Sequence, residues 1–380
     1  MIILDTSRDT LLRAVQGVVG IVERRHTLPI LGHVLIRKTG AQVTFTTTDL
    51  ECQVSTQADI GSGRGDVATT VAAHKLTEIL RALPADQALT LTAIKARLTL
   101  QAGKSRFTLQ TMPAEDFPAV PTSGAEAEWR VPQAVLAGLL DRVAFAMASH
   151  DIRYYLKGVL VTAEGRRLTA VATDGNRLAV AHADLAQDTE RQEFILPRKT
   201  VLELQRLLHS GAGSAGGTGG ADGADSDVAI SLSSAQARFV FSGIRFISKL
   251  IEGQFPDYQR VIPKGNAHRV TVGCAALLTS LERAALLTSD KFRGVRLALS
   301  ADLLRITANN AAQEEAQEEL AVDYTGPALE IGLNVAYVID LLAHSSAETV
   351  QLAFRDAQAS VLFTLPEQPD FAYVVSPMRL

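Results

Sequence analysis

Three segments of the chain carry apolar residues at helical spacing, and each opens a stretch with the same order of elements. Residues 8–25, 132–147 and 274–287 have this spacing and are predicted to form amphipathic helices. Two runs of alternating apolar and polar residues follow each helix, as expected of strands with one buried face. Further strands follow a second, shorter helix in each copy, predicted at residues 74–83, 197–208 and 334–343. The chain therefore repeats one plan three times.

Two landmarks recur in every copy. The first strand contains a glycine, and the second strand ends in a polar turn. The glycines are Gly32, Gly158 and Gly294, and the turn residues are Asp49, Asp174 and Asn309. Both series repeat at about 130 residues, which is the size of a domain and too long for a solenoid repeat. Matching offsets in two independent landmarks indicate that a whole domain is repeated.

Repetition at this length predicts three α+β domains, over residues 1–120, 129–260 and 267–380. In each domain, helices are expected on one face of antiparallel sheets. The second copy is the longest because residues 211–227 form a Gly-rich segment without a large apolar side chain. Such a segment cannot contribute to a core, and we interpret it as a flexible insertion between a helix and a strand.

Composition describes a globular protein with unevenly placed charge. Hydrophobic residues make up 47% and charged residues 21% of the chain, and 37 basic against 41 acidic side chains give a net charge of −4. This balance excludes a uniformly basic nucleic-acid-binding surface but allows a segregated one. The predicted helices are net basic and the rest of the chain is net acidic. A basic helical side is one interpretation, and ordinary solvated helix surfaces are the other.

The residues that could carry redox or metal chemistry are few. Cys52 and Cys274 are the only cysteines, which excludes a disulfide framework and a four-cysteine zinc site. No histidines are spaced as metal ligands. The start of the chain lacks the apolar core of a signal peptide, and no apolar run is long enough to span a membrane. We expect a cytoplasmic protein without metal, cofactor or membrane contact.

Motifs that suggest catalysis fail in their context. Residues 211–216 match GxGxxG, but they follow a helix, whereas a dinucleotide site needs a strand before the motif and a helix after it. Gly103-Lys104-Ser105 lacks the upstream glycine of a phosphate-binding loop and reads as a hairpin. Asp174-Gly175 joins two alternating runs and also predicts a hairpin turn. The sequence therefore gives no positive evidence for an enzyme.

Blocks along the whole chain resemble the bacterial DNA polymerase III beta subunit, the family of DNA sliding clamps. In the first copy they are 27–32 (TLPILG), 48–51 (TDLE) and 116–118 (DFP). In the second they are 153–156 (RYYL), 172–175 (ATDG), 197–199 (PRK) and 255–258 (FPDY). In the third they are 291–297 (KFRGVRL), 306–310 (ITANN) and 377–380 (PMRL). The blocks occur in the family's order, and together they are specific.

The resemblance implies a ring. Two three-domain subunits would close head to tail, with helices inside and sheets outside, around double-stranded DNA that is held without reading its sequence. It implies DNA-facing positions at Arg25, His150, Tyr154, Tyr155, Arg198 and Lys199. His74 stands where the family often has an arginine, which weakens one contact at neutral pH.

The resemblance also implies a pocket for short peptides of partner proteins. The partners would be the polymerase III catalytic subunit, the clamp loader, and other polymerases and repair proteins. The matching positions are Leu156, Thr173, Gly175, Arg177, Leu178, Pro256, Arg260, Val261, Asn334, Tyr337, Val361, Val374, Pro377, Met378, Arg379 and Leu380. Aliphatic side chains and an adaptable methionine suit such a groove. Ser376 replaces a methionine common in the family and makes the groove more polar there.

Two charged segments are candidates for the seam of the ring. Residues 104–109 and 314–319 each lie on a probable edge strand, and their charges are opposite. Charged edges also prevent aggregation, which is the simpler explanation for each alone. Opposite signs at opposite ends of the chain favour a heterologous contact that closes. The seam residues are Lys104, Arg106, Glu314, Glu315, Glu318 and Glu319, to which the resemblance adds Phe107, Leu109, Leu286 and Leu287.

Two functions follow from these observations. The first is a non-enzymatic sliding clamp that tethers a polymerase to DNA as a homodimeric ring. The alternative is a peptide-binding scaffold of three repeated domains that does not encircle DNA. Retention on circular but not on linear duplex DNA separates the two.

Overall fold

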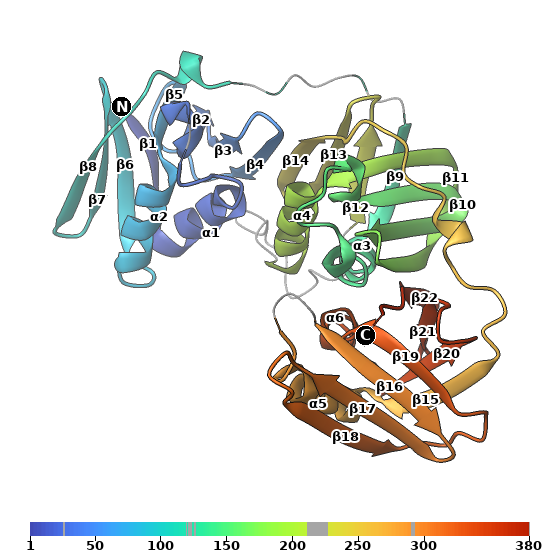
Figure 1. The fold of residues 1–380 in the computed structure, drawn as a ribbon. Coiled ribbons are helices and arrows are strands. Elements are labelled where there is room, and N and C mark those ends of the chain that lie inside the picture. The colour runs from blue at the N-terminus through green and yellow to red at the C-terminus, as the bar shows by residue number, and fades with distance from the viewer. Residues whose placement is uncertain are drawn as a thin grey trace. The chain divides into compact units, whose positions relative to one another are not determined.

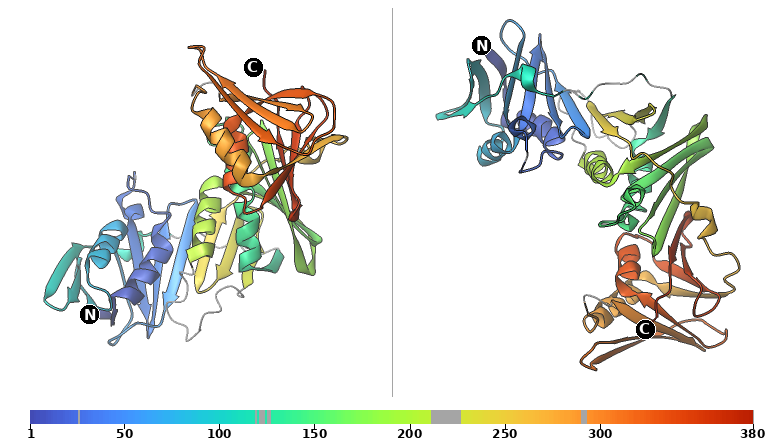
Figure 2. Two further views of the ribbon diagram at one scale, coloured as in Figure 1. Left: turned by 90° about the horizontal axis from the view of Figure 1, so that it is seen from below. Right: turned by 45° about the horizontal axis from the view of Figure 1, so that its top comes forward.

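The computed structural model describes residues 1–25, 27–118, 120, 124, 127–210, 227–289 and 293–379. The predicted insertion at 211–227 lies outside this range except for Asp227. The chain forms two compact units, Met1–Ala137 with Lys199–Leu250 and Gly138–Arg198 with Ile251–Leu380. Figures 1 and 2 show the elements of each unit, and each unit is described by itself.

The first unit contains two antiparallel sheets. In its described part, four strands follow the order β1-β6-β7-β8 and eight follow the order β5-β2-β3-β4-β14-β13-β12-β9. The four-stranded sheet consists of β1 (Ile2–Ser7), β6 (Ala88–Ile94), β7 (Arg97–Ala102) and β8 (Ser105–Gln110). The eight-stranded sheet consists of β2 (His33–Thr39), β3 (Gln42–Thr48), β4 (Cys52–Ala58), β5 (Val67–Ala72), β9 (Ala127–Pro132), β12 (Asp227–Leu232), β13 (Gln236–Phe241) and β14 (Ile244–Lys249). Pairing of β4 with β14 joins strands from the first and second copies of the repeat.

Three helices accompany these sheets: α1 (Arg8–Val19), α2 (Ala73–Ala82) and α4 (Arg198–Ser210). Ser7 caps α1 by accepting a hydrogen bond from the Thr10 amide, and Leu11, Val15 and Val18 form its buried face. The predicted helix at 8–25 is too long, because α1 ends at Val19. Gly20 follows, and a Cβ there would lie 2.3 Å from a carboxylate oxygen of Glu203. A larger residue at position 20 would therefore displace the Glu203 carboxylate, and glycine lets α4 approach closely where the longer helix would have continued.

The second unit also contains two antiparallel sheets. Its described strands follow the orders β10-β11-β22-β21-β20-β15 and β18-β17-β16-β19. The first sheet consists of β10 (Gly158–Thr173), β11 (Arg177–Pro197), β15 (His268–Gly273), β20 (Thr349–Phe354), β21 (Val361–Leu365) and β22 (Gln368–Val375). The second consists of β16 (Gly294–Ser300), β17 (Leu303–Asn309), β18 (Glu315–Ala321) and β19 (Leu329–Asn334). Pairing of β11 with β22 joins the second and third copies of the repeat.

The helices α3 and α5 are shorter than predicted, whereas α4 extends to Ser210, past its predicted end at residue 208. α3 (Gln133–Asp141) stops well before residue 147 and is followed by a 3-10 turn at Ala144–Ala146. α5 (Cys274–Ala285) ends before Leu286 and Leu287, and α6 spans Val335–Ala343. Apolar side chains continue past the ends of α3 and α5, so periodicity alone could not locate them. After α3 the following turn is buried, whereas after α5 the apolar Leu286 is exposed.

The hairpins were predicted correctly. Asp174-Gly175 lies in the turn between β10 and β11, and Gly103 has φ +57° in the turn between β7 and β8. No helix of the described residues is long and apolar enough to cross a membrane. The described residues also contain no cluster of His, Cys, Asp and Glu that could hold a metal ion.

Candidate functional site

The second unit contains a small cavity beside the β10–β11 turn. Its volume is about 150 Å³. Its apolar wall consists of Leu156, Leu178, Phe255, Pro256, Val261 and Val374. Its polar rim consists of Arg153, Thr173, Gly175, Asn176, Arg177, Tyr258 and Ser376. A cavity of this size and lining suits one or two aliphatic or aromatic side chains of a ligand.

Strand pairing between β11 and β22 creates the apolar wall. Leu178 is directly opposite Val374 in this register, and both side chains are almost fully buried. They belong to a cluster of buried residues that also includes Leu156, Ile195 and Phe255. Val261, by contrast, is 48% exposed at the mouth of the cavity. The wall is therefore preformed by the core of the unit, and only its mouth is exposed to solvent.

The β10–β11 turn has a dense set of local hydrogen bonds. The Thr173 hydroxyl donates to the Arg177 carbonyl at 2.5 Å and accepts from the Gly175 amide at 3.0 Å. Oδ1 of Asp174 accepts from the amides of Asn176 and Arg177 at 2.9 and 3.1 Å. Gly175 has φ +92°, and a Cβ there would lie 2.7 Å from a guanidinium nitrogen of Arg153. The turn is thus rigid and requires glycine at position 175.

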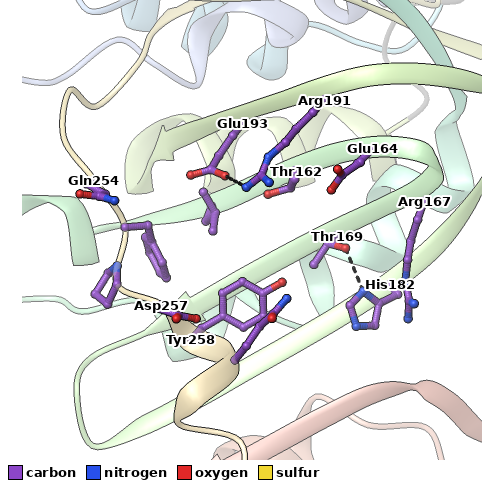
Figure 3. Close-up of a pocket in the computed structure, with 14 residues that line it drawn as sticks. Thr162, Glu164, Arg167, Thr169, His182, Arg191, Glu193, Gln254, Asp257 and Tyr258 are labelled. Carbon is purple, nitrogen blue, oxygen red and sulfur yellow. Dashed lines mark hydrogen bonds and ion pairs between the residues drawn. The ribbon is translucent and has the colours of Figure 1, made fainter.

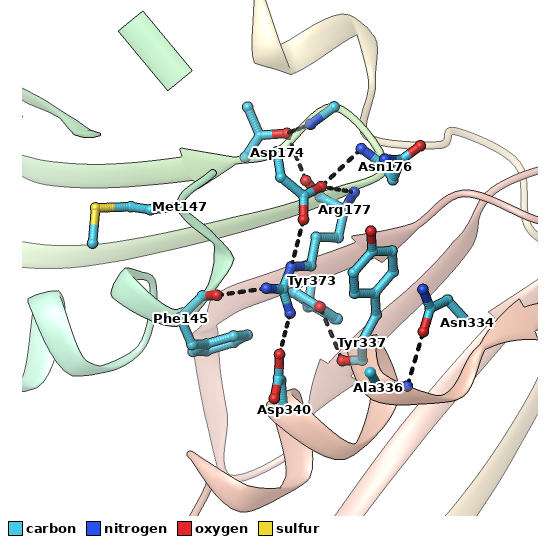
Figure 4. A network of polar contacts seen from close by, with 12 residues as sticks. Phe145, Met147, Asp174, Asn176, Arg177, Asn334, Ala336, Tyr337, Asp340 and Tyr373 are labelled. Atoms are coloured by element: carbon cyan, nitrogen blue, oxygen red, sulfur yellow. Dashed lines mark hydrogen bonds and ion pairs between the residues drawn. The ribbon is translucent and has the colours of Figure 1, made fainter. Parts of the chain in front are cut away.

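Arg177 connects this turn to the third copy of the repeat (Figure 4). Its Nε donates to Oδ2 of Asp174 at 3.0 Å, its Nη1 to Oδ2 of Asp340 at 2.6 Å, and its Nη2 to the Phe145 carbonyl at 2.7 Å. The guanidinium carbon lies 4.6 Å from the centre of the Tyr337 ring. Burial disfavours the charged form, but Tyr373 and Asp340 outweigh burial and raise the pKa of Arg177. The arginine therefore stays charged at all physiological pH values.

The segment after β22 passes from the turn to β19. The Ser376 amide donates to the Asn176 carbonyl at 2.8 Å, and the Met378 amide donates to the Gly332 carbonyl at 2.9 Å. Pro377 and Met378 are half-buried and Arg379 is exposed. Leu380, which was predicted to line the pocket, lies outside the described residues.

The structure brings together one part of the predicted pocket and leaves another part outside the cavity. Predicted residues that line it are Leu156, Thr173, Gly175, Arg177, Leu178, Pro256, Val261 and Val374. Predicted residues that do not line it are Arg260, Asn334, Tyr337, Val361, Pro377, Met378 and Arg379. Asn334 caps α6 by accepting from the Ala336 amide, Arg260 pairs with Asp257, and Val361 is fully buried. Tyr337 contributes indirectly, because its ring lies against the Arg177 guanidinium.

Four lining residues were not predicted, namely Arg153, Asn176, Phe255 and Tyr258, whereas Ser376 was predicted to lie in the groove and does line it. Phe255 and Tyr258 flank Pro256 in a block that the family resemblance had already marked. That block was therefore the available signal for them. Arg153 lies in another such block, 153–156. No local pattern marks Asn176, whose carbonyl meets the Ser376 amide only when the chain end reaches the turn.

A larger polar hollow lies on the other side of the 254–259 segment (Figure 3). Its volume is about 550 Å³, and it shares Phe255, Pro256 and Tyr258 with the small cavity. Arg191 pairs with Glu193 at 3.0 Å, and the Thr169 hydroxyl lies 2.9 Å from Nδ1 of His182. Burial lowers the pKa of His182. Charges of both signs line this hollow, so it has no single electrostatic preference.

Four residues predicted to face DNA lie in the second unit. His150 and Tyr154 are exposed, Tyr155 is half-buried, and the two tyrosine rings meet edge to face at 5.8 Å. Arg198 is half-buried, and its amide donates to the Lys157 carbonyl at 2.9 Å. The Lys157 amide in turn donates to the Tyr154 carbonyl, so Arg198 and Tyr154 share one hydrogen-bonded junction.

The other two predicted DNA-facing residues lie in the first unit and differ in environment. Arg25 is exposed beyond the end of α1. Lys199 donates to Glu23 at 2.7 Å and to Asp49 at 2.5 Å, so its charge is balanced inside the chain. Burial opposes the charged form, but these two carboxylates raise the pKa of Lys199.

A hollow between α1, α2 and α4 gathers basic residues that were not predicted individually. Arg13, Arg24, Arg81 and Arg206 line it together with His74, against a single acidic lining residue, Glu78. Nε2 of His74 lies 2.9 Å from the Val22 carbonyl. The net basic charge of the helices was the signal that pointed to this surface.

The two predicted seam segments lie on edge strands of the described sheets. β8 ends the four-stranded sheet of the first unit, and Phe107 and Leu109 are opposite the buried Leu100 and Leu98 of β7. Both side chains are half-buried, because no further strand covers them, while Lys104 and Arg106 are exposed. The core face of this sheet therefore continues to an open edge.

β18 is the corresponding edge in the second unit, and its charges are partly neutralised. Arg283 of α5 donates to both carboxylate oxygens of Glu318, and Arg305 pairs with Glu319 at 2.9 Å. Glu314 and Glu315 are exposed, and Leu286 is 79% exposed next to the half-buried Leu287. Of the four predicted acidic seam residues, two are thus already paired within the chain.

Comparisons with known proteins agree over the full length. Models of the N-terminal, central and C-terminal domains of the DNA polymerase III beta subunit match residues 3–121, 130–257 and 259–379. The beta sliding clamps of Pseudomonas aeruginosa and Escherichia coli are 41% and 40% identical over 374 and 373 residues, with 98% of each chain covered. A crystal structure of the Pseudomonas aeruginosa clamp bound to griselimycin superposes with a TM-score of 0.93 at 40% identity over 100% of both chains. The Caulobacter crescentus protein gives 0.89 at 34% identity over 100% of both chains.

Repeated α+β domains with helices on antiparallel sheets define the class of DNA clamps. The chain belongs to the DNA polymerase III beta subunit family, the bacterial sliding clamps. The predicted family and fold class are confirmed. Members of this family are non-catalytic processivity subunits of the polymerase III holoenzyme, which agrees with the prediction that the chain is not an enzyme.

Proposed function

We propose that two copies of this chain close head to tail into a ring around duplex DNA and hold the replicative polymerase there, in the cytoplasm. The observation that carries the proposal is the pair of open sheet edges. The β8 edge carries the exposed Lys104 and Arg106 beside half-buried apolar side chains. The region of β18 and the end of α5 exposes Glu314, Glu315 and Leu286. Edges of opposite charge and shared apolar character suit a heterologous contact that closes.

The DNA side of the proposal rests on the helices. The arginine-lined hollow of α1, α2 and α4 provides a basic surface in the first unit, and the exposed Arg25 adds charge to that unit. In the second unit, the exposed Tyr154 is a further proposed DNA-facing residue. Cations that attract phosphates without reading bases permit sliding, since each tight phosphate contact would add salt-dependent affinity and oppose movement.

Topological retention tests the ring directly. The protein is loaded onto nicked circular plasmid and onto the same plasmid after linearisation, and each sample is passed through a sizing column. We expect the clamp to elute with the circle and to be lost from the linear form, because only the circle has no free end. Equal retention on both would refute encirclement and would favour binding by direct contact. Binding to neither, with peptide binding intact, would support the scaffold alternative.

The small cavity is the proposed docking site for a short peptide of the polymerase catalytic subunit, the clamp loader or repair proteins. Two apolar anchors contribute ~1.5–3 kcal/mol each, which with backbone hydrogen bonds corresponds to roughly micromolar affinity. The related Pseudomonas aeruginosa clamp has been crystallised with griselimycin, so a clamp of this fold accepts a compact ligand.

Removal of residues 377–380 tests the peptide site. Half-buried Pro377 and Met378 lie next to the Ser376 rim, so we expect the truncated protein to bind a fluorescent clamp-binding peptide about 30-fold or more weakly, the loss of ~2 kcal/mol of apolar contact. Dimer mass, measured by sedimentation, is expected to stay unchanged. Unaltered peptide affinity in a dimeric truncated protein would refute a role of the chain end in the pocket.

A further inference from the structure

The polar network around Arg177 connects three segments that are distant in the sequence. The arginine belongs to the β10–β11 turn that forms part of the pocket rim, Phe145 belongs to the 3-10 turn after α3, and Asp340 belongs to α6. The side chain of Arg177 is only 9% exposed, and all three segments supply it with an acceptor. Its position is therefore determined by groups from two copies of the repeat (Figure 4).

Asp340 differs from the other members of this network. It does not line the small cavity, and its side chain is 40% exposed, so a bound ligand in the cavity would not contact it. Its Oδ2 nevertheless accepts the shortest hydrogen bond of the guanidinium, at 2.6 Å. Its own carbonyl accepts from Nδ1 of His344 at 2.8 Å, and the His344 ring stacks on Phe145 at 4.8 Å.

We infer that Asp340 is a positioning residue for the peptide pocket: it holds Arg177 against Tyr337 and thereby fixes the 174–177 turn that forms the pocket rim. This inference rests on the proposed function of the cavity as a peptide site. It assigns a role in binding to a residue that the peptide does not touch.

The physical reason is the loss of a charge-assisted hydrogen bond from a guanidinium that is almost fully buried. Without the Asp340 carboxylate, the guanidinium keeps only Asp174 as an anionic partner, and Asp174 also holds the amides of Asn176 and Arg177. With one remaining carboxylate, the guanidinium either competes with these amides for the Asp174 oxygens or turns toward solvent. In either case the turn loses its fixed geometry, and a peptide must then order the turn when it binds.

The experiment compares three full-length variants by titration of a fluorescein-labelled peptide copied from the clamp-binding segment of the polymerase III catalytic subunit. Asp340→Asn keeps the shape but removes the charge, and we expect about 10-fold weaker binding. Asp340→Glu restores the carboxylate at an accessible helix position, and we expect affinity within about threefold of wild type. Asp356→Asn is the matched control, because Asp356 makes one exposed ion pair with Arg355 and lines no part of the pocket.

Sedimentation and thermal unfolding accompany each titration. Loss in Asp340→Asn with rescue in Asp340→Glu, at unchanged dimer mass, supports the positioning role. Wild-type affinity in Asp340→Asn overturns it. Equal loss in Asp340→Asn and Asp340→Glu overturns it as well, because a role in folding alone would not distinguish charge from shape. If the wild-type protein itself binds no peptide, it is the proposed function of the cavity that has failed.

Discussion

Burial determines the chemistry of the two cysteine side chains. Cys52 is buried beside the hydroxyls of Thr200 and Ser248, at 3.3 and 3.8 Å. Burial raises the pKa of its thiol to about 11, and burial also raises the pKa of Cys274. Since only the thiolate is nucleophilic, both cysteines are chemically quiet structural residues.

This burial predicts the reactivity of the thiols. At pH 8 neither cysteine of the folded protein is expected to react with a thiol reagent on the timescale of minutes, because almost all of each thiol is protonated and covered. In guanidinium chloride both should react at once. The measurement is the absorbance of the coloured thiolate that Ellman's reagent releases, with the denatured protein as control. Fast reaction of one thiol in the native protein would contradict the buried position of that cysteine.

At the scale of elements, the open edge of β8 combines charge with apolar surface. Phe107 and Leu109 extend the core face of their sheet to the edge. The proposed acidic partners of Lys104 and Arg106 include Glu318 and Glu319, which are already paired within the chain. Exposed ion pairs contribute little when each partner has alternatives. The apolar pair should therefore contribute more to dimerisation than the charges.

Two double variants measure this difference. Phe107→Ala with Leu109→Ala is expected to weaken the dimer by ~2–4 kcal/mol, about 30- to 1000-fold in Kd. Lys104→Glu with Arg106→Glu should weaken it by less, and Thr108→Ala, an exposed position between the apolar pair, should leave it unchanged. Sedimentation equilibrium gives the Kd values, and thermal unfolding excludes loss of the fold. A larger effect of the charge reversal would show that the seam is mainly electrostatic.

The helices are the second element of the proposed function. Arg24 and Arg81 line the basic hollow of the first unit, and Arg64 lies in the loop between β4 and β5 outside it. Arg24→Glu with Arg81→Glu should weaken association with DNA at low salt. It should also reduce the slope of log K against log[salt] by about 2, since each lost phosphate contact reduces this slope by about 0.9. Arg64→Glu is expected to change neither. Fluorescence anisotropy over a salt series provides both quantities, and an unchanged slope in the double variant would argue against a DNA-facing role of this hollow.

At the scale of the whole molecule, the Gly-rich segment between α4 and β12 makes the second of the three copies the longest. α4 ends at Ser210 and β12 begins at Asp227, and both pack into the core of the first unit. Deletion of residues 213–222 removes sequence without large apolar side chains and leaves a short connection. Loop closure depends only weakly on length, so the free energy of unfolding should change by less than about 1 kcal/mol. Urea unfolding measures this difference, and a loss of several kcal/mol would show that the segment is not a simple insertion.

Local pattern determined much of this protein. The period of apolar residues and the recurring glycine and turn positions predicted the repeat and the hairpins at 103–105 and 174–175. The charge pattern predicted the two edge strands. Each of these features depends on residues close together in the sequence. Only tertiary structure decided where α1 ends and that Arg177 meets Asp340. It also decided which carboxylates neutralise Lys199 and Arg283. Most of these contacts join residues from different copies of the repeat, and the Arg283–Glu318 pair joins α5 to β18 within the third copy. A periodic pattern specifies which face of an element is buried, but it does not specify what covers that face.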